Sequence, residues 1–141
     1  VFIEAFDCKH RAIIGELVCK YILLYRQAAA IICNAKFRDA GALLRENYPI
    51  WCTGFTPVGC FNTKPEKSLD EMIVTEHKSM YDGAIAVCDD CGVVIIPKEL
   101  HTEVFYQKLV HIEEQEDIWF NRLDHYKENT FEIVCQKKYL K

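Results

Sequence analysis

The sequence predicts a mixed α/β protein, in which small sheets are layered with helices. Three observations lead to this fold class. The first half of the chain alternates short apolar runs with segments of helical periodicity. The second half holds two closely spaced apolar runs and then one long amphipathic segment. Half of the 141 residues are hydrophobic and 27% are charged, as in ordinary globular domains, so we expect a single domain spanning 1–141.

The first half of the chain is expected to alternate strand and helix, because its apolar spacing changes period several times. Val1–Phe6 is a short apolar strand, and Gly15 precedes a helix over 16–27 with apolar residues at helical spacing. The next predicted elements are a buried strand over 28–33, a loop over 34–37, a helix over 40–45 with Asp39 as N-cap, a strand over 50–53 and a turn-rich loop over 54–67.

The second half is expected to hold hairpin-like strands and a long helix. A strand is predicted over 71–75, with a turn at 81–83. The remaining predicted elements are strands over 84–88 and 93–96 around the tight loop 89–92, a long helix over 98–126 that starts after Pro97 and belongs to the same domain, and a final strand over 131–135. This order favours mixed layers over a doubly wound sheet.

The charge and the cysteines exclude several classes of protein. The net charge of −4 argues against binding nucleic acid by phosphate neutralisation, and no apolar run is long enough to span a membrane. Five of the eight cysteines lie inside apolar runs, where a free thiol behaves as a small hydrophobe: Cys19, Cys33, Cys52, Cys88 and Cys135. We therefore expect a reducing, cytoplasmic location. Because the chain begins with Val1 inside a strand pattern, we also expect a segment upstream of it.

Most familiar motifs of catalysis are missing from the sequence. Cys88 and Cys91 form a C-x-x-C pair, but no second pair of ligands accompanies it, so a β-turn that carries two thiols is the better interpretation. The five histidines form no H-E-x-x-H pattern. Nucleophile elbows and glycine-rich phosphate loops are also absent from the sequence.

The strongest candidate site joins Arg38–Asp39 to Gly15–Glu16, since each pair stands between a strand pattern and a helix pattern. The carboxyl edge of a sheet is where α/β proteins usually bind ligands. A helix that starts at Glu16 offers backbone N–H groups to a carboxylate, Arg38 can hold a carboxylate or an enolate, and Asp39 can bind a hard divalent cation. The alternative is a surface ion pair with a helix cap, and a first-turn acid favoured by the helix dipole.

Four segments, in this order, resemble the family that unites the regulator of ribonuclease activity A with the 4-hydroxy-4-methyl-2-oxoglutarate/4-carboxy-4-hydroxy-2-oxoadipate aldolases. The similar family patterns are a segment ending in G-[DE]-L, then D-G-x-x-R-D, P-V-[FW]-A-R-G-x-T-P and G-D-x-V-x-A-D-x-D-G-V-V-V-x-P. The matching residues are 11–17, 34–39, 49–57 and 83–97. Four weak motifs in register over about 100 residues make the resemblance fairly specific.

The resemblance implies a swivelling β/β/α domain that assembles as a homotrimer or a hexamer. It implies a lyase that uses Mg²⁺ or Mn²⁺ and acts on a small 2-oxo acid, by retro-aldol cleavage of 4-hydroxy-2-oxo diacids or decarboxylation of oxaloacetate through a pyruvate enolate. Its implied site residues are Arg38 and Glu16 as catalytic groups, Gly15, Glu16, Leu17, Val18 and Arg38 as substrate-binding groups, and Asp39 as the metal anchor.

Departures from the family patterns leave a second hypothesis open. Asn34 and Ala35 stand where the family has Asp and Gly, Thr53 stands where it has Arg, and Ala84 and Cys91 replace acidic residues. These changes indicate a divergent member, and they motivate the alternative of a non-catalytic regulator that acts by protein interaction. Loss of the Arg–Asp pair marks the family's non-catalytic regulators, so the retained Arg38 and Asp39 favour an enzyme.

Overall fold

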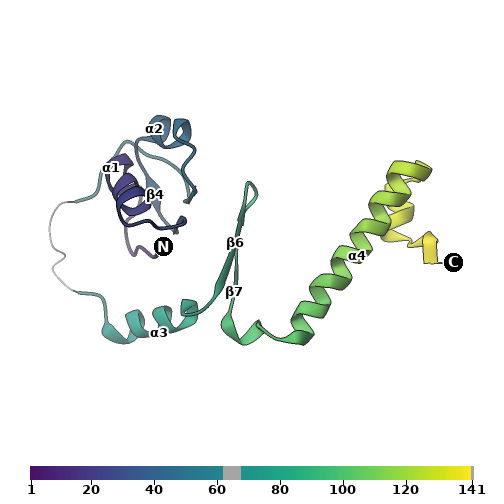
Figure 1. Ribbon diagram of the computed structural model, residues 1–141. Coiled ribbons are helices and arrows are strands. Elements are labelled where there is room, and N and C mark those ends of the chain that lie inside the picture. Colours follow the sequence, from purple (N-terminus) through teal and green to yellow (C-terminus); the bar gives the residue numbers. More distant parts are fainter. Residues whose placement is uncertain (62–67, 141) are drawn as a thin grey trace. The chain divides into compact units, whose positions relative to one another are not determined.

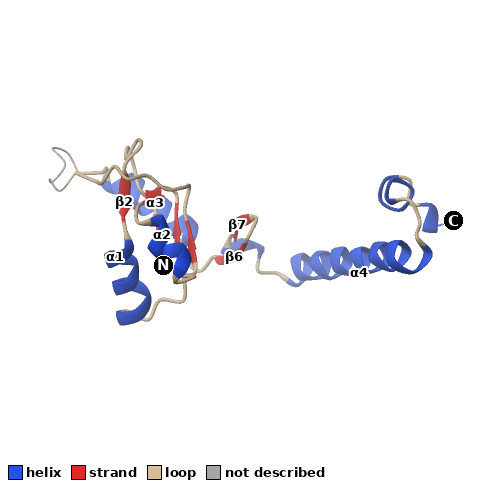
Figure 2. Ribbon diagram, turned by 90° about the horizontal axis from the view of Figure 1, so that it is seen from above, coloured by secondary structure: helices blue, strands red, loops and turns tan. Residues whose placement is uncertain are grey.

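A computed structural model describes residues 1–61 and 68–140 (Figure 1). These residues form two compact units, one made of 1–79 with 86–95 and the other of 80–85 with the chain from 96 onward. Short sheets and helices alternate along the chain, which confirms the mixed α/β class (Figure 2). Part of the predicted loop over 54–67, residues 62–67, lies outside the described residues. The single domain spanning 1–141 stays a prediction.

The first unit is built around a parallel sheet with the strand order β1-β3-β5. Its strands are β1 (Phe2–Ile3), β3 (Ile31–Cys33) and β5 (Ile50–Trp51). Parallel neighbours need a crossover between them. The crossovers contain the helix α1 (Glu16–Lys20) with the π-helical turn η1 (Tyr21–Tyr25), and the helix α2 (Ala40–Arg45). The strands at 28–33 and 50–53 and both helices are therefore confirmed, with shorter strands than predicted.

A second pair of parallel strands in this unit had no counterpart among the predicted elements. The strand β2 (Ala12–Ile14) pairs with β4 (Lys36–Phe37), and Ile14 lies opposite Phe37. The predicted loop over 34–37 was thus partly wrong. Strands of two or three residues are too short to show alternation, so only the fold reveals them. Both strands end where a candidate junction begins.

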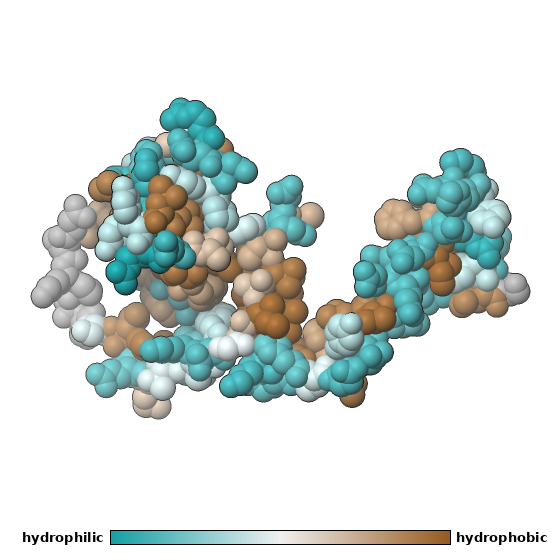
Figure 3. Space-filling model, in the orientation of Figure 1, coloured by the Kyte–Doolittle hydropathy of each residue, from teal (hydrophilic) through white to brown (hydrophobic). Residues whose placement is uncertain are grey.

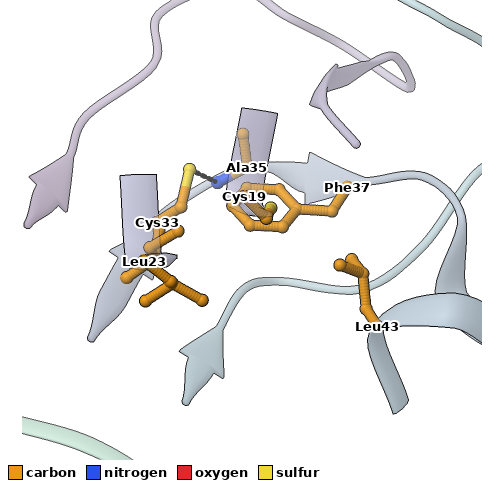
Figure 4. Close-up of a cluster of buried hydrophobic side chains, with 7 residues drawn as sticks. Cys19, Leu23, Cys33, Ala35, Phe37 and Leu43 are labelled. Carbon is orange, nitrogen blue, oxygen red and sulfur yellow. Dashed lines mark hydrogen bonds between the residues drawn. The ribbon is translucent and has the colours of Figure 1, made fainter. Parts of the chain in front are cut away.

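The core of the first unit lies between α1, η1 and the strands (Figure 4). Phe37, Ile31 and Cys19 are fully buried, and Cys19 and Leu23 face inward because residues four apart share one side of a helix. The cluster also holds Cys33, Ala35 and Leu43. Phe37, which directly precedes Arg38 in the sequence, therefore anchors β4 in the core.

The eight cysteines differ widely in their environments. Burial, and secondarily Cys52, raises the pKa of Cys19 to about 11, and burial also raises the pKa of Cys33. Cys60, Cys91 and Cys135 are exposed. The prediction of buried thiols is confirmed for Cys19 and Cys33 and wrong for Cys135, which lies on a short helical turn.

We expect alkylation of the folded protein near pH 8 to label the exposed thiols first, because the thiolate is the nucleophile. Cys19 and Cys33 should react only on unfolding, as peptide mass spectrometry would show. Rapid labelling of Cys19 in the native protein would contradict its burial. Since burial raises the pKa of Cys19 from about 9 to about 11, the stability that the neutral thiol contributes is present below pH 9 and is lost as the pH rises toward 11.

The helix α3 (Glu71–Tyr81) replaces the strand predicted over 71–75, which was wrong. Its start is marked by Asp70, whose Oδ1 accepts a hydrogen bond from the Met72 N–H at 2.8 Å. An aspartate before the first helical residue and a glutamate in the first turn are helix-start signals. These signals at Asp70 and Glu71 outweigh the short apolar run that suggested a strand.

The predicted hairpin is present as β6 (Ile85–Asp89) and β7 (Gly92–Ile96). Asp89 shapes its turn, because Oδ1 accepts from the N–H groups of Cys91 at 2.8 Å and Gly92 at 3.0 Å. The Asp89 carbonyl accepts from Trp51 Nε1 at 2.7 Å. The C-x-x-C pair lies at this turn, as the turn interpretation predicted.

The second unit is dominated by the helix α4 (Glu103–Tyr126), which confirms most of the predicted long helix. A 3₁₀ turn, η2 (Lys98–Leu100), precedes it, and the Thr102 side chain caps it by accepting from the Phe105 N–H. Every side chain of α4 is at least partly exposed, and hydrophobic patches interrupt its hydrophilic surface (Figure 3). No helix in the described part of the chain combines the length and hydrophobicity needed to cross a membrane.

The strand predicted over 131–135 was also wrong, because this segment forms the π-helical turn η3 (Phe131–Cys135). Ile133 is buried at 2% exposure, and it lines an apolar pocket with Trp119 and Leu123 of α4. The chain then ends in the 3₁₀ turn η4 (Lys138–Leu140), where the Tyr139 hydroxyl accepts from Trp119 Nε1 at 3.1 Å. Packing on a helix thus decides the structure of this short apolar run.

Candidate functional site

The two predicted junctions meet at one edge of the β2–β4 pair. Gly15 and Glu16 directly follow β2, and Arg38 and Asp39 directly follow β4. The Arg38 N–H donates to the Ile14 carbonyl at 3.0 Å, which ties the two strand ends together. Because parallel strands present their carboxyl ends at the same edge, the pairing of β2 with β4 brings the junctions into contact.

Asp39 links the two junctions through its side chain. Its Oδ2 accepts a hydrogen bond from the Glu16 N–H at 3.0 Å, across 23 residues of sequence. Asp39 does occupy the N-cap position of α2, as predicted, and its carbonyl accepts from Ala42 and Leu43. The side chain, however, makes no cap hydrogen bond to α2. It caps α1 instead, whose own N-cap residue, Gly15, has no side chain to do so.

The backbone of Asp39 lies in the left-handed region, with φ 63° and ψ 35°. Aspartate is among the few residues other than glycine that enter this region often. The conformation turns the chain sharply from β4 into α2. It thereby directs the Asp39 carboxylate toward the start of α1 rather than along its own helix.

Gly15 gives this carboxylate the space that it occupies. A β-carbon built on Gly15 would overlap Asp39 Oδ2, and it would lie 2.8 Å from Cγ and 3.1 Å from Nε of Arg38. The φ of Gly15 is −140°, a value that other residues adopt readily. The site therefore requires glycine for close approach and not for backbone freedom.

Arg38 extends over Gly15 into solvent. Its Nε lies 3.6 Å from Asp39 Oδ2, and the side chains of Arg38 and Asp39 are 53% and 42% exposed. Ion pairs this exposed contribute about 0–1 kcal/mol to stability. The pair is thus a weak stabilising device, and its accessibility leaves Arg38 donors available to a ligand.

The remaining predicted residues lie in the first turn of α1. Glu16 is half-buried, whereas Leu17 and Val18 are exposed. Leu17 is 83% exposed. The first N–H groups of a helix have no partner within the helix, and one of these, that of Glu16, is bound by Asp39. The structure brings Gly15, Glu16, Arg38 and Asp39 together.

Two further residues reach this site and were given no role from the sequence. Gly59 lies beside Arg38, because a β-carbon built on Gly59 would lie 3.1 Å from Arg38 Nη1. Arg11 donates from its Nη1 to the Gly59 carbonyl at 2.8 Å. Arg11 could have been noticed in the sequence because it begins the segment that ends in Gly15–Glu16–Leu17. Gly59 could have been noticed because it lies just after Thr56–Pro57.

The donor set fits a hard divalent cation that keeps most of its water. Among the described residues, no group of three or more His, Cys, Asp or Glu side chains is arranged to hold a metal ion. Mg²⁺ commonly binds through one or two carboxylates, with waters and substrate oxygens completing its shell. A carboxylate has about four lone-pair sites, so the bond from Asp39 Oδ2 to Glu16 leaves acceptor capacity.

Two departures from the family motif have clear structural roles. Asn34 bridges to Ala5 in both directions, since its Oδ1 accepts from the Ala5 N–H at 2.7 Å and its Nδ2 donates to the Ala5 carbonyl at 3.3 Å. An aspartate could accept but could not donate. Ala35 is buried at 2% exposure, within the core cluster. These changes therefore support the fold next to β4 and leave Arg38 and Asp39 in place.

Comparison with known proteins assigns the family. The family model described as RraA-like, Aldolase/RraA, matches residues 1–95, which hold both junctions and the β6–β7 hairpin. The chain belongs to the RraA-like family. No curated protein matches the sequence. The family contains both aldolases and regulators of ribonucleases, so membership alone leaves the activity open.

Two solved structures share the RraA-like fold. One is RraAS2 of Streptomyces coelicolor, described as an unusual member of the RNase ES inhibitor RraA protein family, with a TM-score of 0.56 and 20% identity over 82% of this chain. The other is an uncharacterized protein from Pseudomonas syringae pv. tomato, with a TM-score of 0.59 and 15% identity over 92% of this chain. The RraA-like chain spans 58% and 64% of the lengths of these two proteins.

Proposed function

We propose that this RraA-like chain carries the active site of a divalent-metal-dependent lyase for 2-oxo acids. Its reactions would be retro-aldol cleavage of 4-hydroxy-2-oxo diacids, decarboxylation of oxaloacetate, or both. The observation that supports this proposal is the convergence of Arg38 and Asp39 on the first turn of α1, where Asp39 Oδ2 accepts from Glu16 N–H at 3.0 Å. A cationic fork, a carboxylate and backbone amides thus lie close together at one exposed edge.

Each group has a chemical role in this proposal. Among the N–H groups of Gly15 to Val18, those other than the Glu16 N–H, which Asp39 binds, would bind the substrate carboxylate, since a helix start favours anions. Cleavage of the C–C bond would release CO₂ from oxaloacetate, or a second carbonyl product from a 4-hydroxy-2-oxo diacid whose 4-hydroxyl proton passes to a water. The bonding electron pair would stay on the pyruvyl carbon and delocalise onto the 2-oxo oxygen as an enolate. Arg38 would donate hydrogen bonds to that oxygen, and a proton from water would then convert the enolate to pyruvate. Glu16 would hold a catalytic water near the substrate.

Asp39 would anchor Mg²⁺ or Mn²⁺, which supplies Lewis-acid polarisation of the 2-oxo group when bound. The fixed Glu16 N–H at Oδ2 orients the carboxylate before any ligand arrives. Orientation of a metal-binding carboxylate by a hydrogen-bond donor strengthens metal binding. The exposed Arg38 lies beside it and would share the negative charge of the substrate.

The direct test is release of pyruvate from oxaloacetate and from a 4-hydroxy-2-oxo diacid, with and without Mg²⁺ or Mn²⁺. We expect turnover that a chelator abolishes and either metal restores. The preparation should be oligomeric and should contain any upstream sequence of the natural protein. Absence of turnover by that preparation would contradict the proposal, and unchanged turnover by Glu16→Gln would contradict the role of Glu16.

Asp39→Asn should raise the metal concentration for half-maximal turnover at least about tenfold, because the amide removes the charge that attracts the cation. The Asn Oδ1 can still accept from Glu16 N–H, so the melting temperature should change little. Asp39→Ala should show the same metal defect and should also lose about 1 kcal/mol of stability with the hydrogen bond. A metal response that is identical in Asp39→Asn and wild type would show that Asp39 does not anchor the cation.

The second candidate is a non-catalytic regulator of a ribonuclease. It is favoured by the fold shared with RraAS2, a member of the RNase ES inhibitor family, and by Thr53 and Cys91, which replace charged residues of the aldolase motifs. Inhibition of RNase ES cleavage by this chain, retained in Arg38→Ala, would support it. Inhibition that is lost in Arg38→Ala would place the effect at the proposed active site instead.

We further propose that the protein works in the cytoplasm as a homotrimer or hexamer, without nucleic acid or membrane as partner. The family assignment and the buried thiols of Cys19 and Cys33 support this assignment. Light scattering on the purified protein would check the oligomer. A monomer that retains full turnover would contradict it.

A further inference from the structure

The segment 54–59 runs from β4 to the Arg38 side chain. Its first half is fixed to β4, because the Phe37 N–H donates to the Gly54 carbonyl at 3.0 Å and the Thr56 N–H donates to the Phe37 carbonyl at 2.9 Å. Its far end, Gly59, lies beside the guanidinium, because Arg38 Nη1 is 3.1 Å from the place that a β-carbon on Gly59 would take. A shift of Gly59 would therefore change the space open to the guanidinium.

Arg11 and Ala12 bind the far end of the segment 54–59. The Ala12 N–H donates to the Val58 carbonyl at 2.8 Å, and Arg11 Nη1 donates to the Gly59 carbonyl at 2.8 Å. The Arg11 guanidinium also lies 3.7 Å from the centroid of the Phe61 ring. The hydrogen bond to Gly59 engages the edge of the Arg11 guanidinium, and the Phe61 ring packs on its face. The two contacts together hold the guanidinium next to Gly59.

The guanidinium of Arg38 thus lies beside two glycines and occupies space that side chains at these positions would take. Its Nε is 3.1 Å from a β-carbon built on Gly15, and its Nη1 is 3.1 Å from one built on Gly59. Gly15 is set by the β2–β4 pairing, whereas Gly59 is set by Arg11. A long exposed side chain has many rotamers, and ordering it before a ligand binds lowers the free-energy cost of binding.

We propose that Arg11 is a positioning residue for Arg38. By holding the Gly59 carbonyl, Arg11 fixes the end of the segment 54–59, and this segment keeps the Arg38 guanidinium oriented toward the start of α1. This inference rests on the proposed function for its catalytic consequence, but the geometry of Arg38 can be measured without turnover. Arg11 acts through Gly59 and touches Arg38 only by way of that residue.

A purely structural role for Arg11 predicts a different outcome. A cation–π contact at an exposed site is worth about 0.5–1 kcal/mol, and a hydrogen bond about the same, so losing both should leave the protein folded. A direct substrate contact by Arg11 predicts that its effect persists when Arg38 is absent. These alternatives differ in measurable ways from an effect transmitted through Arg38.

The first experiment observes the Arg38 Nε–H resonance by NMR, assigned by its disappearance in Arg38→Lys. In Arg11→Ala we expect this resonance to move toward the position of freely exposed arginines, while the backbone amide spectrum of the core is kept. Arg26→Ala, at an exposed arginine after η1, is the matched control and should leave the resonance in place. An Arg38 resonance unchanged by Arg11→Ala would overturn the proposal.

Should Arg11→Ala fail to fold, Phe61→Ala provides the second variant. It removes the ring against Arg11 and keeps the hydrogen bond to Gly59, so a smaller shift in the same direction is expected. Arg11→Lys should also give a partial shift, because lysine can donate to the Gly59 carbonyl but lacks the planar group. No shift in either folded variant would overturn the positioning role.

The second experiment is a double-mutant cycle on oxaloacetate decarboxylation. Arg11→Ala should lower kcat/KM about tenfold in the wild-type background, since small displacements of a catalytic group are costly. In the Arg38→Ala background it should change the residual rate less than about twofold, because coupled residues are not additive. Equal losses in both backgrounds would overturn the proposal. Absence of turnover in wild type would contradict the proposed function, and the Arg38 resonance would then decide the positioning role alone.

Discussion

Replacing Arg38 with alanine should lower kcat for pyruvate release by about 10²- to 10³-fold or more, with little change in melting temperature. The expected size follows from the loss of one fixed donor to a developing oxyanion. Stability should be kept because the Arg38–Asp39 pair is about half exposed, and such pairs contribute little to folding. Steady-state assays and thermal unfolding on the same preparation would measure both quantities.

Arg38→Lys is the control that separates charge from geometry. Lysine keeps the positive charge but cannot form two parallel hydrogen bonds to a carboxylate or an enolate. We expect it to recover only part of the lost rate, with a larger defect in kcat than in KM. Full activity of Arg38→Ala would remove Arg38 from the mechanism, and loss of folding in both variants would instead make the pair a structural element.

The parts of the fold that could be predicted are those with enough residues to show a period. The hairpin around 89–92 and the helix α4 have long patterns and clear end signals, and both are present. The strands wrongly predicted at 71–75 and 131–135 are five-residue segments with only three apolar residues in a row, for which strand and helix patterns look alike. Their structures depend on a cap at Asp70 and on packing of Ile133 against α4.

The candidate site was only partly visible in the sequence. Arg38 and Asp39 could be found because they follow an apolar run and match a family motif. The sequence could not show that the Asp39 side chain caps α1 rather than α2, because this contact depends on the pairing of β2 with β4. These strands are too short to be read from a pattern. The same pairing explains why Gly15 lies so close to the carboxylate.

If the proposed lyase activity holds, Gly15→Ala should lower turnover more severely than its single added methyl group suggests. The new β-carbon would occupy the space of Asp39 Oδ2 and crowd Cγ and Nε of Arg38, so both side chains must move. Overpacking of this kind costs about 1–3 kcal/mol of stability. Since both proposed functional groups are displaced together, we expect a loss of kcat/KM of about 10²-fold or more.

Gly41→Ala is the matched control, because a β-carbon built on Gly41 meets no atom within 4 Å and the residue lies in the exposed part of α2. Alanine there should raise stability by about 0.5–1 kcal/mol through helix propensity, with turnover unchanged. Metal titration of Gly15→Ala adds a second measurement, since displacing Asp39 should weaken the response to Mn²⁺ as Asp39→Asn does. If Gly15→Ala kept wild-type turnover and metal response, the close approach of Asp39 and Arg38 over Gly15 would not be the catalytic arrangement.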